Sequence, residues 1–437
     1  MKTFLNLCTD LAWGIQCVLL IYAIYNVILA LPFFRKDKPM KHFAPQKRFA
    51  VLVAARNEES VIGSLVESLL AQDYPKELFD VYVIPNNCSD DTAEAARRAG
   101  AWILTCTAPV KCKGDALSFA FDYFEKKGNP YDAFCIFDAD NLVDRNFLRS
   151  MNDAFCSGAK AAQGRRDSKN PYDSPLTGSY SIYYWMISRF YNHPRSLWNL
   201  SAVINGCGFA VSAGLLKELG GFHTKTLTED LEFTTQCILR DQKVAWVPEA
   251  VFYDESPLQF SPSWKQRRRW SAGVFQCLRL YGPRLLGKLI RERKLLCLDQ
   301  FLFLTAPLMQ ILSLVPAALA VLLFLLSPGR PLQPSSCPYF SPFSGVPCSP
   351  SPLPFWAGAS SSFWRNGPSE SSGKPSSITG SFWPAGSPST WFASSAAPPP
   401  GRRSSTPAAS PSGRSPPPND TQRPAAKTAD CPFRCSS

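Results

Sequence analysis

Apolar and polar positions follow four different patterns along this chain of 437 residues. The first segment contains an almost uninterrupted apolar run, and the second alternates short apolar runs with stretches whose apolar positions recur every three to four residues. The third is again continuously apolar, and the fourth is rich in proline and serine. Because each pattern is typical of a different kind of structure, we expect four regions. Their boundaries are residues 1–45, 46–294, 295–326 and 327–437.

The second region has the pattern of an α/β domain. Apolar runs of strand length are followed by segments with helical periodicity, and this order recurs along the chain. Such an alternation predicts a mostly parallel sheet with helices on both faces. Strands are expected at 48–55, 79–85, 101–106 and 131–140, and helices at 59–72, 90–100 and 113–127.

Polar side chains follow three of the predicted strands, at the edge where parallel sheets bind their ligands. These side chains are Arg56, Asn57 and Glu58, then Asn86, Asn87, Ser89 and Asp90, then Asp138 and Asp140. The chain has no GxGxxG after the first strand and no GxxxxGK[ST] motif. Neither a dinucleotide-binding fold nor a P-loop is therefore supported.

Asp138 and Asp140 end the last of these strands, with Ala139 between them. The strand end brings both carboxylates near one point. Carboxylate oxygens suit a hard divalent cation such as Mg²⁺ or Mn²⁺, which shares its coordination shell with substrate phosphates. The alternative is a solvated acidic turn. The apolar strand directly before the two aspartates favours the metal site.

Glu229 and Asp230 lie in the stretch TLTEDLEF, ahead of a helical pattern. The simpler interpretation is a helix whose N-terminus is stabilised by acidic residues. The functional interpretation makes Asp230 a general base, which requires that it lie close to the metal site.

The stretch SWKQRRRW, residues 263–270, places three arginines between Gln266 and Trp270. A basic amphipathic segment of this kind can rest on lipid headgroups. It can equally bind a ligand, because arginine holds a diphosphate by bidentate hydrogen bonds and tryptophan stacks on a sugar ring. The segment alone does not decide between the two.

The two apolar regions predict a membrane protein. The run at 11–34 is long enough to cross a hydrocarbon core of ~30 Å, and with no cleavage site of small residues we expect a retained anchor. The basic stretch at 35–48 then places the α/β domain in the cytoplasm. The run at 295–326 contains Pro307 and Pro316, which predict one kinked helix or two short helices in a hairpin. We therefore expect a multi-pass protein of the cell membrane.

Composition narrows the possible partners. The formal net charge is +12, but lysine and arginine concentrate beside the apolar runs and around Arg267. This distribution favours a membrane surface or a phosphate ligand, and no nucleic-acid-binding signature accompanies it. The 15 cysteines form no Cys-x-x-Cys pair and there are only three histidines, so neither a disulfide framework nor a zinc cluster is expected.

The tail, residues 327–437, carries most of the 39 prolines and few acidic residues. A disordered linker is one interpretation, but such linkers are poor in aromatic residues, whereas tryptophan and phenylalanine recur here. Our hypothesis is a coding sequence translated out of frame, in place of further membrane helices.

Seven motifs in order resemble one family. They are ARNEE, NNCSDDT, KGDAL, DAD, NGCGFAVS, TED and QRRRW, and they cover residues 48–280. This set resembles the membrane-bound inverting glycosyltransferases of family 2, which include cellulose, hyaluronan and poly-N-acetylglucosamine synthases and ceramide glucosyltransferase. The resemblance implies a GT-A fold, with a mixed, mostly parallel sheet, and a nucleotide-diphosphate sugar as donor.

On the donor side, the resemblance implies that Asp140 is the main metal ligand, with Asp138 nearer the nucleotide. Arg56 and Glu58 would lie beside the base and ribose, and Lys113 near the nucleotide or diphosphate.

On the acceptor side, the resemblance implies that Asp230 deprotonates the acceptor hydroxyl for in-line attack, with Glu229 beside the acceptor. Gln266 and Arg269 would hold the leaving diphosphate, and Trp270 would stack under the acceptor. A metal and an arginine that neutralise the leaving group, with a carboxylate that activates the nucleophile, form a coherent mechanism.

One position departs from the family, which usually has an aspartate where this chain has Asn86. An amide oxygen still accepts a hydrogen bond from the base, but the amide also donates, so the preference for a nucleotide is open. We expect a UDP-linked donor and a saccharide acceptor, with polysaccharide synthesis favoured. The alternatives are single transfer to a lipid acceptor and an inactive sugar-nucleotide-binding protein. Membrane lipid is an expected partner, nucleic acid is not, and no protein partner is identified.

Overall fold

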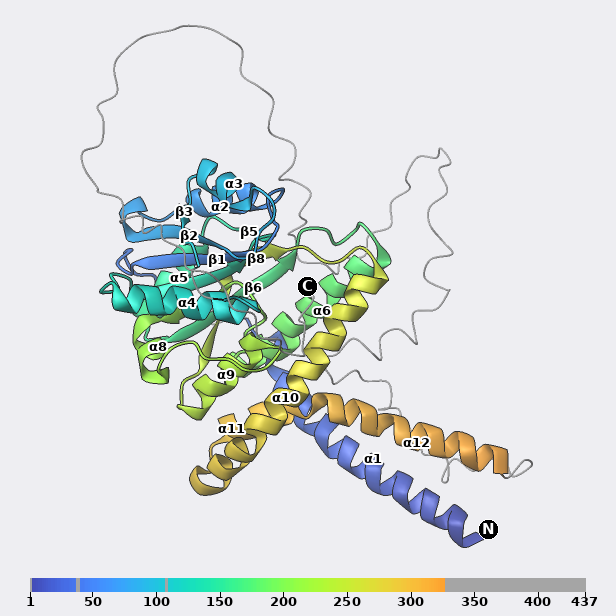
Figure 1. The fold of residues 1–437 in the computed structure, drawn as a ribbon. Coiled ribbons are helices and arrows are strands. Elements are labelled where there is room, and N and C mark those ends of the chain that lie inside the picture. The colour runs from blue at the N-terminus through green and yellow to red at the C-terminus, as the bar shows by residue number, and fades with distance from the viewer. Residues whose placement is uncertain (1, 37–39, 107–108, 327–437) are drawn as a thin grey trace, which may run out of the picture. The chain divides into compact units, whose positions relative to one another are not determined.

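The computed structural model describes residues 2–36, 40–106 and 109–326, and the predicted tail at 327–437 lies outside the described residues. The described residues form one sheet and a set of helices (Figure 1). The strands are β1 (Phe49–Ala55), β2 (Phe79–Pro85), β3 (Trp102–Ile103), β4 (Ala133–Asp138), β5 (Leu142–Val143), β6 (Ala161–Ser168), β7 (Phe209–Ser212) and β8 (Val244–Asp254).

The helices of the α/β domain lie between these strands and after them. They are α2 (Ile62–Leu70), α3 (Thr92–Arg98), α4 (Lys113–Lys126), α5 (Phe147–Cys156), α6 (Pro175–Met186), α7 (His193–Leu197), α8 (Ala213–Leu219), α9 (Glu229–Leu239) and α10 (Phe260–Glu292). Short helices are η1 (Leu31–Phe34), η2 (Lys76–Leu78) and the π-helical η3 (Ile187–Asn192). The apolar helices are α1 (Lys2–Ala30), α11 (Leu295–Leu304) and α12 (Ala306–Leu326).

Every strand and helix predicted between residues 48 and 140 is present. The largest difference is β3, which has two residues where the pattern predicts a strand over 101–106. β3 is an edge strand that pairs only with β2, so it lacks the second partner that would extend it.

All eight strands form one sheet in the order β3-β2-β1-β4-β7-β6-β8-β5. β1 pairs in parallel with β2 and β4, and β2 with β3, as the alternation of strands and helices predicts. In the other half, β7 is antiparallel to β4 and β6, β6 is parallel to β8, and β5 is antiparallel to β8. The sheet is therefore mixed, and it is parallel throughout only in the half that the sequence pattern predicts.

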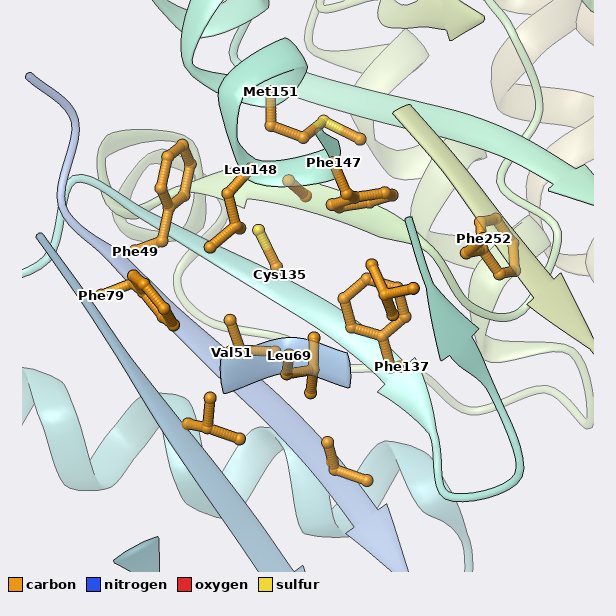
Figure 2. Close-up of a cluster of buried hydrophobic side chains, with 14 of the residues drawn as sticks. Phe49, Val51, Leu69, Phe79, Cys135, Phe137, Phe147, Leu148, Met151 and Phe252 are labelled. Carbon is orange, nitrogen blue, oxygen red and sulfur yellow. The ribbon is translucent and has the colours of Figure 1, made fainter. Parts of the chain in front are cut away.

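Apolar side chains cover both faces of the sheet, as predicted. Along β1, Phe49, Val51 and Val53 point into a cluster with α2 and α5, while Ala50 and Leu52 point into a second cluster with α4. Figure 2 shows the first cluster, in which α5 and α2 pack against the strands. Because both faces are buried, β1 is apolar at successive positions.

The stretch Asn6–Phe34 is the one described helix that is long and apolar enough to cross a membrane by itself, and few of its residues are buried. α11 and α12 meet the same criterion only as a pair, bent by 54°. The bend lies at Thr305 and at neither proline. Pro307 occupies the first turn of α12, where its missing N–H removes no helical hydrogen bond, and Pro316 lies within α12. The apolar run at 295–326 therefore forms two helices separated by a bend at Thr305, and whether it crosses a membrane as one kinked span or as a hairpin stays a prediction.

A buried ion pair joins the apolar helices to the α/β domain. Arg195 of α7 and Asp299 of α11 are both buried, with 2.9 Å between Nε and Oδ2. Tyr25 of α1 donates its hydroxyl to Asp299 Oδ1 at 2.9 Å. The Arg195 guanidinium also lies 3.4 Å from the centroid of the Tyr191 ring. Residues from four separate elements therefore meet at this pair.

Replacing Arg195 with alanine is expected to lower the free energy of unfolding by about 3–5 kcal/mol, because Asp299 would keep a buried charge without its partner. Denaturant melts of the full chain in detergent micelles measure this. The control is Arg149→Ala, which breaks an exposed pair with Asp73 and is expected to cost less than about 1 kcal/mol. Equal losses in the two variants would contradict the role assigned to the buried pair.

Candidate active site

The loops that follow β1 and β2 are joined at the carboxyl edge of the sheet. Asn57, with a positive φ of 58°, accepts hydrogen bonds from the N–H and the hydroxyl of Ser89, at 2.8 and 3.3 Å. The backbone N–H of Glu58 donates to the Thr92 hydroxyl at 2.9 Å. The polar groups predicted after these two strands therefore lie side by side.

Asn86 lies in the same edge, where it replaces the usual aspartate. Its Nδ2 donates to the carbonyl of Ala55 at 3.1 Å, and its backbone N–H donates to the same carbonyl at 3.0 Å. The amide donor is thus occupied within the loop, and Oδ1 keeps the acceptor character that an aspartate would have. Arg56 is exposed next to this position.

Asp138 at the end of β4 is held by a lysine from α4. The Nζ of Lys113 lies 2.5 Å from Asp138 Oδ1 and donates to the carbonyl of Gly206 at 2.7 Å. Burial acts to lower the pKa of Lys113, but the Asp138 carboxylate raises it above its usual value. Burial acts in turn to raise the pKa of Asp138, and Lys113 holds it below its usual value. Both groups are therefore ionised at neutral pH.

A second buried carboxylate, Asp254 at the end of β8, lies beside the first. Arg166 of β6 forms an ion pair with it and donates to the carbonyl of Asn205 at 3.2 Å. Asn141 Nδ2 donates to Asp254 Oδ1 at 2.5 Å, while Asn141 Oδ1 accepts the backbone N–H of Asp138 at 3.0 Å. Asn141 and Arg166 therefore fix the turn that carries the two predicted metal ligands.

Negative charge is crowded at this edge. Burial, followed by the carboxylates of Asp254 and Asp138, raises the pKa of Asp140 to about 7. Burial and Asp138 also raise the pKa of Glu58. A divalent cation would relieve this repulsion, since carboxylate oxygens are the ligands that Mg²⁺ and Mn²⁺ prefer.

The group of atoms that could bind a metal ion differs in part from the predicted pair, Asp138 and Asp140. Among the described residues, Asp138, Asp254 and Cys207 place oxygen and sulfur atoms within 4.8 Å of one another. Burial raises the pKa of the Cys207 thiol well above its usual value, and a soft sulfur suits a hard cation less well than a carboxylate oxygen does. The carboxylates are thus the groups that fit a hard cation, and Asp140 lies on the same turn outside this group of three.

Asp230 lies in the first turn of α9 and close to this cluster. A Cβ placed on Gly206 would lie 3.8 Å from Asp230 Oδ2, and Gly206 is the residue whose carbonyl accepts from Lys113. Burial, followed by the neighbouring Glu229 carboxylate, raises the pKa of Asp230 to about 6. The structure therefore brings Asp230 to the same edge as Asp138, with Lys113 and Gly206 between them.

The QRRRW stretch lies within α10 and contacts α6. The hydroxyl of Tyr180 donates to Gln266 Oε1 at 3.1 Å, and the Tyr180 ring lies edge-on to Trp270 with centroids 6.2 Å apart. Arg267 Nε donates to the same hydroxyl at 3.3 Å, and its guanidinium lies 4.7 Å from the ring centroid. Tyr180 thus organises this segment from α6.

The same helix is fastened to the loop that carries Asp230. Arg269 donates to the carbonyl of Leu227 at 3.0 Å. At Gly273 a Cβ would lie 2.5 Å from the side chain of Thr228, so only glycine permits this approach of α10. Arg269 therefore lies next to the loop that leads to Asp230, and its charge acts to lower the pKa of that carboxyl.

Sequence reasoning missed three members of the site: Asp254, Arg166 and Asn141. One signal was available, because β8 ends in aspartate directly after a buried strand, as β4 does. Arg166 gave no comparable signal, since it lies in a half-polar strand whose partners come from distant parts of the chain.

A family model described as "Glycosyltransferase like family 2" matches residues 45–273. The chain is 28% identical over 240 residues to a probable glycosyltransferase, YdaM, of Bacillus subtilis, covering 52% of this chain and 55% of that protein. It is 26% identical to the beta-monoglucosyldiacylglycerol synthase of Synechocystis, covering 53% of this chain and 49% of that protein. It is 25% identical to the UDP-forming cellulose synthase catalytic subunit of Pseudomonas fluorescens, covering 59% of this chain and 36% of that protein. The chain thus spans about half the length, or less, of these relatives.

Among solved structures, the mannosyltransferase PcManGT from Pyrobaculum calidifontis, in complex with GDP-Man and Mn²⁺, has a similar fold. The TM-score is 0.55 at 18% identity, covering 74% of this chain and 88% of that one. Its likeness concerns the fold alone. Because the family model spans more than half of the chain and includes the strands and loops of the candidate site, the protein belongs to glycosyltransferase family 2.

Proposed function

We propose that this protein transfers a sugar, with inversion, from a nucleotide-diphosphate sugar to an acceptor hydroxyl at a membrane. The observation that carries the proposal is the place of Asp230: a carboxylate with a raised pKa that lies beside Gly206, next to the Lys113–Asp138 pair. A base near neutrality, close to a site suited to a diphosphate, is what inverting transfer requires.

The donor half of the site would hold the nucleotide and its diphosphate. Asp138 and Asp140 would bind Mg²⁺ or Mn²⁺, whose charge offsets that of the leaving diphosphate. Lys113 would contribute positive charge from the same side. Arg56 and Asn86 would border the base, with Glu58 near the ribose. We propose a UDP-linked donor, in keeping with the related UDP-forming cellulose synthase.

The acceptor half would place a hydroxyl between Asp230 and the anomeric carbon. Asp230 would accept the hydroxyl proton as the oxygen attacks, and Glu229 would help to bind the acceptor. Gln266 and Arg269 would donate hydrogen bonds to the departing diphosphate, and the Trp270 ring would support the acceptor sugar.

A saccharide acceptor, and with it polysaccharide synthesis, is the function we favour. The ring of Trp270, which is partly exposed and packs edge-on against the buried Tyr180, supports it, because flat rings stack on sugars. Transfer of one sugar to a lipid is the second candidate, supported by the related glucosyldiacylglycerol synthase and by the exposed apolar surface of α1. We also propose that α1 and the α11–α12 pair anchor the chain as a multi-pass protein, with the domain in the cytoplasm.

Membranes that contain this chain are expected to release nucleoside diphosphate from one of a panel of UDP- and GDP-sugars, and Asp230→Asn is expected to reduce the rate by roughly 10²–10⁴-fold. The control is Asp122→Asn, the same change at an exposed position of α4, which should leave the rate unchanged. Product length then separates chain extension from single transfer. No release from any donor by folded protein would favour the inactive alternative.

Activity is expected to depend on the protonation of Asp230. With a pKa of about 6, the base is protonated at low pH, so kcat/KM should rise with pH and level off above about 7. Measuring kcat/KM from pH 5 to 8 with a saturating metal tests this. In Asp230→Asn the residual rate should lose that dependence, and an unchanged profile would assign the titration to another group.

Metal binding is expected to stabilise the fold, more strongly at higher pH. In metal-free protein the pKa of Asp140 is raised to about 7, so its contribution to stability is lost as pH rises from about 4 to about 7. Mn²⁺ should restore the melting temperature above pH 7, where no proton competes. Asp140→Asn should weaken both effects, and a variant with a full response to Mn²⁺ would exclude Asp140 as a ligand.

A further inference from the structure

A separate basic cavity lies between the C-terminal end of α9 and the second half of α10. Its volume is about 560 Å³, and its lining includes Arg240, Arg284, Lys288, Arg291 and Glu292. None of these residues forms the site described above. Four cationic side chains and one carboxylate line the cavity. Repulsion among the four cations disfavours this arrangement unless an anion balances their charge.

The carboxylates near this cavity already have partners: lysines for Asp241 and Glu292, and the Tyr281 hydroxyl with two backbone N–H groups for the buried Glu232. Asp241 lies 2.8 Å from Nζ of Lys288 and 2.6 Å from Nζ of Lys294. Glu292 lies 3.0 Å from Nζ of Lys294. Lys288 also donates to a backbone carbonyl at 2.7 Å, at the end of α9. Lys288 and Lys294 thus form ion pairs within the protein, and these pairs neutralise Asp241 and Glu292.

The charge of the three arginines is not balanced by a neighbouring carboxylate. Within the part of the chain that the structure describes, none of Arg240, Arg284 and Arg291 has a carboxylate at salt-bridge distance. All three are exposed at the rim, and the Arg284 guanidinium lies over the ring of Tyr281, 5.7 Å from its centroid. Planar guanidinium groups are the side chains that bind phosphate oxygens in pairs, and a cavity of this size admits a phosphate with its substituents.

The position of the cavity suggests where the phosphate comes from. α10 ends at Glu292, and the apolar helix α11 begins at Leu295, which is 68% exposed. Ile290, on the last turn of α10, is 77% exposed. Exposed apolar side chains that flank a group of arginines are typical of a surface that meets lipid headgroups.

We propose that this cavity is an anion site that binds a phosphate group through Arg240, Arg284 and Arg291. The phosphate belongs either to the headgroup of an anionic phospholipid or to a soluble phosphate, and both share the chemistry that the arginines recognise. Neither Asp230 nor the predicted metal ligands line this cavity. A negative result here would therefore leave the proposed transfer reaction unaffected, and the reverse also holds.

The experiment titrates the full chain, purified in detergent micelles without donor sugar, and measures binding by calorimetry. One arm adds short-chain phosphatidylglycerol, with phosphatidylcholine as the uncharged comparison, and the other adds inorganic phosphate or pyrophosphate. The test variant is Arg240→Gln with Arg284→Gln. The matched control is Arg279→Gln, an exposed arginine of α10 outside the cavity.

Saturable binding in either arm that weakens at least about tenfold in the double variant, and is kept in Arg279→Gln, supports the site and identifies the source. Binding that is absent in both arms, or equal in wild type and double variant, overturns it. Should the double variant melt below the wild type, the single variant Arg291→Gln, at the exposed end of α10, takes its place with the same expected direction.

Discussion

Two largely covered cations, Lys113 and Arg166, make the acidic edge of this sheet possible. Lys113 forms an ion pair with the half-exposed Asp138, and Arg166 forms one with the buried Asp254, where an unpaired charge would be disfavoured. Among the described residues, no cation forms an ion pair with Asp140, and its pKa rises accordingly. This imbalance is the reason that the edge suits a divalent cation, and the ionised state of the other two carboxylates depends on cations contributed by α4 and β6.

The NGCG stretch brings these groups together because its backbone approaches closely. Gly208 has a φ of +63°, and a Cβ there would lie 2.0 Å from an atom of the Phe252 ring. Gly206, also at positive φ, presents its carbonyl to Lys113. A larger residue at position 208 would push the Phe252 ring of β8 away, and with it Asp254 from Asp138, whereas at position 206 the positive φ of 86° favours glycine. The glycines thus set the spacing of the carboxylates without contributing a functional group.

The half of the fold that could be predicted from the sequence is the half built from local patterns. β1 to β4 and the helices between them follow one another along the chain, so apolar periodicity and loop chemistry were sufficient. β6, β7 and β8 pair across long intervals, and β6 carries polar residues that become buried only on contact with their partners. Arg166 and Asp254 are 88 residues apart, and Arg195 and Asp299 are 104 apart. A periodic pattern of apolar residues cannot show that two positions so far apart in the sequence are in contact. The resemblance to the family, by contrast, identified Asp138, Asp140 and Asp230 together as candidate site residues.

The contact between Gly273 and Thr228 has a mechanical consequence. Because α10 touches this loop without an intervening side chain, the helix cannot turn about its axis without displacing Thr228, and Asp230 lies two residues further along. Arg269 adds a hydrogen bond to the same loop. The loop that leads to Asp230 and the segment of α10 around Arg269 and Gly273 are therefore held against each other, so a displacement of α10 would reach Asp230 through Leu227 and Thr228.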